Sequence, residues 1–74
     1  MTTMETLINA IKEQNPSAEV TEQDSAATLE SVGLDSLDIA TVIMEVENAL
    51  DVKVSEEDIT GETTLGEFCA LLAA

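Results

Sequence analysis

The sequence contains no histidine and no arginine, one cysteine and one aromatic residue, Phe68. Without histidine, neither a Ser–His–Asp triad nor a Cys–His pair can form. A single cysteine, Cys69, permits no internal disulfide, and the usual zinc sites need more cysteine or histidine ligands than this chain has. We therefore expect no metal site and none of the common sets of nucleophilic catalytic residues.

Positive charge is almost missing as well. Two lysines stand against sixteen aspartates and glutamates, so the formal net charge is −14 and the pI is near 4.1. This charge would repel nucleic acid and anionic membranes, so we expect neither as a partner and expect basic proteins instead. The chain has no basic leader followed by a long apolar run, which favours the cytoplasm over secretion.

The chain is short, with 74 residues and a mass of 7.8 kDa, and we interpret residues 1–74 as one domain and a monomer. Hydrophobic residues make up 45% of it and fall in blocks with helical spacing, which argues against disorder despite the high charge. A core of this size gives only marginal stability, and repulsion among the carboxylates lowers it further.

Four predicted helix starts share one pattern, in which a capping side chain is followed three residues later by an acid. The four segments begin at Thr2, Asp35, Ser55 and Thr64. We expect the first helix to end at Asn15-Pro16, because the residue before proline is disfavoured in a helix. The second should run to about Leu50, and the third should stop near Gly61. The expected fold is all-α, a four-helix bundle of three longer helices and one short third helix.

Two further features of the pattern bear on function. Residues 17–35 form a long polar loop, which in so small a domain is often functional. Its possible core contacts are Val20, Leu29, Val32 and Leu34. The predicted second helix has a main apolar stripe of Ile39, Val42, Ile43, Val46 and Leu50, and a second stripe of Leu37, Ala40 and Met44. We expect one stripe to face the core and the other to face a ligand or partner.

The segment from Gly33 to Asp38 places Ser36 in the first turn of the second helix. A hydroxyl at this corner points outward, where an enzyme can reach it, and the helix N-terminus favours a phosphate attached there. Asp35 and Asp38 would repel such a phosphate, so we interpret them as charges for recognition. The simpler interpretation is that Asp35 and Ser36 only cap the helix.

The motif Asp-Ser-Leu-Asp at residues 35–38 resembles the signature of the acyl carrier protein family. The resemblance covers essentially the whole chain: its length, acidity and long first loop, Met44 in the second helix, the acids at 56–58, and the threonines at 63–64. It implies a carrier and not an enzyme. A phosphopantetheinyl transferase would attach 4′-phosphopantetheine from coenzyme A to Ser36. Acyl groups would then travel as thioesters to partner enzymes of fatty-acid, polyketide or related specialised biosynthesis.

The resemblance also implies two sets of site residues. Side chains expected to meet basic patches on loading and transfer enzymes are Asp35, Leu37, Asp38, Met44, Glu47, Glu56 and Glu57. Side chains expected to line a pocket for the acyl chain are Ile39, Val42, Ile43, Val46, Ile59 and Phe68. Two plainer interpretations stand beside these: Met44 packs in the core, and the charged residues form a solvated face.

The chain departs from the common fatty-acid pattern at three positions. Thr41 and Asn48 stand where acids are common, and Leu50 replaces a frequent phenylalanine. These changes fit a specialised carrier, and an aminoacyl or D-alanyl carrier with the same arm is the nearest alternative. An unmodified acidic adaptor for one basic partner is the alternative of a different class. Cys69 lies on the apolar stripe of the last helix, so we expect an inert thiol there and not a thioester site.

Overall fold

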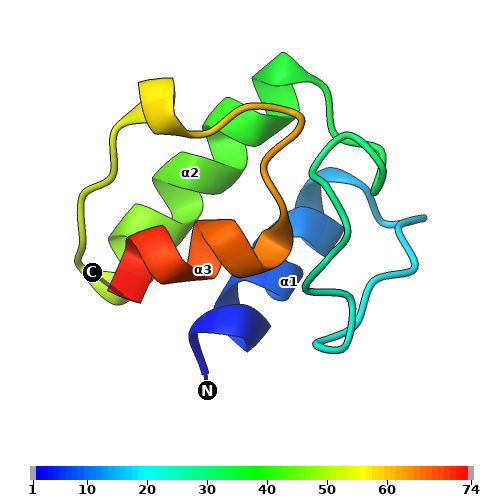
Figure 1. Cartoon of the computed structure of the whole chain (residues 1–74), viewed down its shortest axis with the longest axis horizontal. Helices are drawn as coiled ribbons and strands as arrows, with labels where there is room; N and C mark the ends of the chain where they lie inside the picture. Colours follow the sequence, from blue (N-terminus) through cyan, green and yellow to red (C-terminus); the bar gives the residue numbers. More distant parts are fainter. Residues whose placement is uncertain (1, 74) are drawn as a thin grey trace.

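The computed structural model describes residues 2–73, which form three α-helices joined by long connections (Figure 1). The elements are α1 (Thr3–Gln14), α2 (Ser36–Leu50), a single turn of 3-10 helix η1 (Glu56–Asp58), and α3 (Leu65–Ala73). These residues contain no strand, and their one isolated β-bridge joins Thr28 to Thr64. The all-α prediction is therefore confirmed.

The predicted count of four helices is not met, because the expected third helix is only one 3-10 turn, η1. Ser55 makes no capping hydrogen bond with its side chain, and none of the three η1 residues is buried. A helix of three adjacent acids lacks an apolar face to pack, and a single turn has too few hydrogen bonds to offset the cost of nucleation. Packing begins only with the next residue, the buried Ile59.

The three α-helices begin where the capping pattern predicts. In α1 the Thr2 side chain accepts a hydrogen bond from the Glu5 amide at 3.1 Å, and Glu5 accepts one from the Thr2 amide in return. In α3 the same exchange joins Thr64 and Glu67, at 3.1 and 2.9 Å. Hydrogen bonding of the Glu67 carboxyl with the Thr64 backbone, and then with the Thr64 side chain, lowers the pKa of that carboxyl. Each box satisfies amides that the first turn of a helix leaves unpaired.

The core lies where α1 packs against both α2 and α3. Phe68 of α3 and Leu7 and Ile11 of α1 are completely buried within it. The main stripe of α2 also faces the core, with Leu50 only partly buried at its end. Helical spacing thus correctly predicts which face of α2 is covered.

The long loop over residues 15–35 is attached to this core and covers one side of the helices, at the right of Figure 1. Val20, Leu29 and Leu34 are buried, as predicted, and Val32 is partly buried. The loop backbone also pairs with the start of α3, where the Leu65 amide donates to the Ala27 carbonyl at 2.9 Å. These contacts fix the route that the chain takes into α2.

Within residues 2–73, no helix combines the length and the apolar character needed to cross a membrane.

Candidate functional site

Ser36 is the first residue of α2 and is exposed. The preceding residue, Asp35, is the N-cap: its Oδ1 accepts from the Asp38 amide at 2.8 Å, and Asp38 Oδ2 accepts from the Asp35 amide at 3.3 Å. Among residues 2–73 the Ser36 hydroxyl has no hydrogen-bond partner. Capping therefore falls to Asp35, and the serine hydroxyl is left open to solvent.

A cavity of about 360 Å³ adjoins Ser36, between α2 and the segment that includes η1. Its lining residues are Ser36, Ile39, Ala40, Ile43, Glu56, Ile59, Thr60 and Gly61. Three of the six residues predicted to line an acyl pocket are thus brought together beside the serine. The other three, Val42, Val46 and Phe68, are fully buried in the core and do not line this cavity.

Five of these lining residues were not predicted to line a pocket. Ser36 and Glu56 were predicted in other roles, and the remaining three are Ala40, Thr60 and Gly61. Ala40 could have been included, because it belongs to the second apolar stripe of α2. Thr60 and Gly61 lie where the third helix was expected to stop, and no periodic pattern marks them. Their place at the cavity depends on how the chain packs after η1.

Two larger hollows lie elsewhere on the surface. One of about 520 Å³ is lined by α1 and α2 residues such as Glu13 and Glu45, and one of about 540 Å³ lies beside α3 and includes Leu71. Neither has Ser36 in its wall. The smaller cavity is therefore the one that relates to the serine.

Two large apolar side chains of α2 lie outside the core. Leu37 is 72% exposed and Met44 is 57% exposed, so Met44 does not pack in the core. The two lie seven residues apart, which places them on one face of the helix about two turns from each other. Both are available for contact with another protein, and the assigned partner role stays a prediction.

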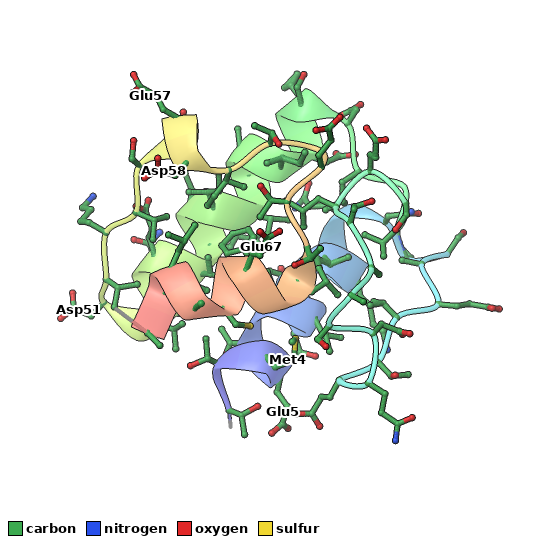
Figure 2. All side chains as sticks on the ribbon, in the orientation of Figure 1. Met4, Glu5, Asp51, Glu57, Asp58 and Glu67 are labelled. Atoms are coloured by element: carbon green, nitrogen blue, oxygen red, sulfur yellow. The ribbon has the colours of Figure 1, made fainter. Side chains whose placement is uncertain are left out.

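The acidic residues predicted to contact partner proteins differ in whether their carboxylates already accept hydrogen bonds within the chain. Asp35 and Asp38 accept hydrogen bonds from each other's backbone in the helix cap. Glu47 is half-buried, and its Oε2 accepts from the Val54 amide at 2.9 Å, which ties the end of α2 to the link that follows it. Glu56 and Glu57 are exposed, and Figure 2 shows Glu57 pointing away from the helices. Their partner role also stays a prediction.

Cys69 is partly buried, and its Sγ lies 3.7 Å from Met4 Sδ. Burial raises the pKa of the thiol, which favours its protonated form over the reactive thiolate. Within residues 2–73 no group of three or more His, Cys, Asp or Glu side chains is placed to hold a metal ion.

A small helical domain with a strongly acidic chain and an open serine at the start of α2 has the features of a carrier domain. A family model described as the phosphopantetheine attachment site matches residues 5–72. The chain belongs to this family, and it is a phosphopantetheine carrier protein, consistent with the acyl carrier proteins that its sequence resembles. No solved structure matches the chain.

The family fixes the cofactor and the general kind of partner. Its domains are the site of covalent 4′-phosphopantetheine attachment; they are modified by a phosphopantetheinyl transferase and deliver to enzymes. The surroundings of Ser36 fit such a group. The hydroxyl is exposed, it stands at the positive end of the dipole of a 15-residue helix, and the apolar walls of Ile39 and Ile43 lie beside it.

Proposed function

We propose that this protein carries acyl intermediates as thioesters on an arm attached to Ser36. It delivers them to partner enzymes of fatty-acid, polyketide or related specialised biosynthesis. The observation that carries the proposal is the open hydroxyl of Ser36 at the start of α2, in a chain whose family bears this arm. The other serines, Ser17, Ser25, Ser31 and Ser55, are exposed as well, but none begins an α-helix.

In this proposal the protein supplies position and charge, and the arm supplies the thiol that carries the acyl group. The cap formed by Asp35 fixes the direction in which the chain enters α2 and so places the Ser36 hydroxyl. The exposed Leu37 beside it offers an apolar contact to the enzyme that modifies the serine. Glu56 and Glu57 add negative charge, which speeds the encounter with basic enzymes more than it tightens the complex.

We propose in addition that the cavity beside Ser36 shelters part of the cargo. The side chains of Ile39, Ile43 and Ile59 give it apolar walls, and its volume of about 360 Å³ suits a short acyl segment. The deeper residues Val42 and Phe68 would contact cargo only if the core opened, because both are completely buried.

A second candidate within the same class is an aminoacyl carrier. Glu56 is one of the residues that line the cavity beside Ser36, and its carboxylate could pair with the ammonium group of an aminoacyl cargo. The two candidates share the arm and the serine. They differ in the enzyme that loads the thiol.

The arm is tested by mass spectrometry of the intact protein. The unmodified chain is incubated with coenzyme A and a broad-specificity phosphopantetheinyl transferase, together with the variants Ser36→Ala and Ser55→Ala. We expect the wild type and Ser55→Ala to gain the mass of one phosphopantetheine group and Ser36→Ala to gain none. Ser55 is a matched control because it is also exposed and has acids after it.

An unmodified wild type would refute the proposal and leave the unmodified acidic adaptor as the better explanation. An equal gain in Ser36→Ala would refute Ser36 as the attachment site. If the arm is added, the loaded form is offered to an acyl-loading enzyme and to an aminoacyl ligase in parallel. Loading by the ligase alone would select the aminoacyl carrier.

A further inference from the structure

Asn15, the residue after α1, joins the end of that helix to the segment that leads into α2. Because Pro16 follows, a helical backbone is disfavoured at Asn15. The backbone angles of Asn15 are φ −138° and ψ 87°, which are not helical. The side-chain amide donates a hydrogen bond to the carbonyl of Val32 at 3.1 Å. This bond spans 17 residues and ends four residues before Ser36.

Gly33 makes room for this contact. Its φ is +89°, and a β-carbon built on it would collide with the Asn15 side-chain amide. The same segment is held from the other side, because the Gly33 amide donates to the Glu30 carbonyl at 3.0 Å and the Leu34 amide to the Leu29 carbonyl at 3.3 Å. Residues 32–34 are thus fixed between the loop and the end of α1.

We propose that Asn15 is a positioning residue for the modification of Ser36. The inference rests on the function proposed above. The first turn of α2 depends on the extended backbone of Asp35, which directly follows the fixed segment 32–34. If Asn15 loses its amide, this segment loosens, and an enzyme that binds Ser36 must restore its order, so binding becomes weaker.

The test compares Asn15→Ala with a matched control, Thr6→Val. The control removes one hydrogen bond at the opposite end of α1, where the Thr6 hydroxyl donates to the Thr2 carbonyl at 3.1 Å. KM and kcat of a phosphopantetheinyl transferase are measured for each full-length chain at a temperature where circular dichroism shows all of them folded. We expect KM to rise about fivefold for Asn15→Ala, with little change in kcat and no change for Thr6→Val.

Amide hydrogen exchange gives a second measurement. Exchange at Gly33 and Leu34 should be faster in Asn15→Ala, while the amides of α3 keep their wild-type rates. A general loss of stability would instead accelerate exchange throughout the core.

The outcomes separate this inference from the proposed function. If the wild type gains the arm and Asn15→Ala has the same KM, the inference is overturned and the proposed function stands. An equal rise of KM in Thr6→Val also overturns it, since the effect would then be one of stability and not of position. If the wild type gains no arm at all, the proposed function fails and the inference fails with it.

Discussion

Gly33→Ala tests how strictly the chain before the serine is constrained. At φ +89° the β-carbon of an alanine clashes with its own backbone. We take the cost as about 1–2 kcal/mol, the value for an L-residue in the left-handed helical region. Alanine also restricts the unfolded chain, which offsets about 0.4–1 kcal/mol of that cost. The backbone alone therefore predicts a modest loss of stability.

The methyl group adds a second cost, because it would collide with the side-chain amide of Asn15. If the amide moves aside, its hydrogen bond to Val32 is lost, at about 1 kcal/mol. Together the two effects predict a loss of about 2 kcal/mol, within a total stability on the order of 4–11 kcal/mol for a domain of this length. The variant should remain folded but unfold at a clearly lower urea concentration.

Urea unfolding followed by circular dichroism measures this loss as a lower midpoint with an unchanged slope. The control is Gly61→Ala, where φ is not positive. The nearest atoms to the added carbon all belong to the Glu30 side chain, with the flexible carboxylate 3.0 Å away and Cβ at 3.4 Å, so we expect a loss of less than about 0.5 kcal/mol. In the double variant with Asn15→Ala the collision disappears, so the combined loss should fall short of the sum by about 1 kcal/mol. Equal losses at the two glycines, or simple additivity, would refute the reasoning.

Three further predictions concern the core, the helix interface and the surface. Phe68→Ala should cost about 3–5 kcal/mol and unfold at a much lower urea concentration than the wild type, whereas Phe68→Leu should lose less stability. Burial, with the hydrogen bond and charge of Glu13, raises the pKa of Glu45, so ionisation of Glu45 lowers stability as pH rises. The free energy of unfolding of Glu45→Gln, measured in urea, should therefore equal that of the wild type near pH 4 and exceed it at pH 7 by less than about 1 kcal/mol. A variant that is more stable than the wild type only at pH 4 would contradict this prediction. Leu37→Ser and Met44→Ser should leave the unfolding midpoint unchanged and raise the KM of enzymes that act on the arm.

The starts of the α-helices could be predicted because a capping box involves residues only three positions apart. The pattern at Thr2, Asp35 and Thr64 forms the predicted hydrogen bonds in each case. The same pattern at Ser55 does not produce an α-helix. A cap can start a helix, but only a packed apolar face sustains one, and that face is missing from Glu56–Asp58.

The cavity could be predicted only in part, because helical spacing identifies a stripe and not its depth. Ile39 and Ile43 lie at the cavity beside Ser36, while Val42 on the same stripe is completely buried. Whether a residue of this stripe lines the cavity depends on the segment after η1, which places Ile59 at the same cavity as Ile39 and Ile43. This packing joins residues about twenty positions apart, and no local pattern encodes it.

The serine site itself combines local and distant control. Residues 35–38 cap their own helix and leave the Ser36 hydroxyl open, which a four-residue motif is sufficient to specify. The route of the chain into α2 depends on a more distant contact, the hydrogen bond from Asn15 to the Val32 carbonyl. The sequence around Asn15 indicates only the end of α1. Proline at position 16 both ends that helix and frees Asn15 to reach Val32. A residue interpreted as a stop signal thus also holds the segment that leads to Ser36, the proposed attachment site.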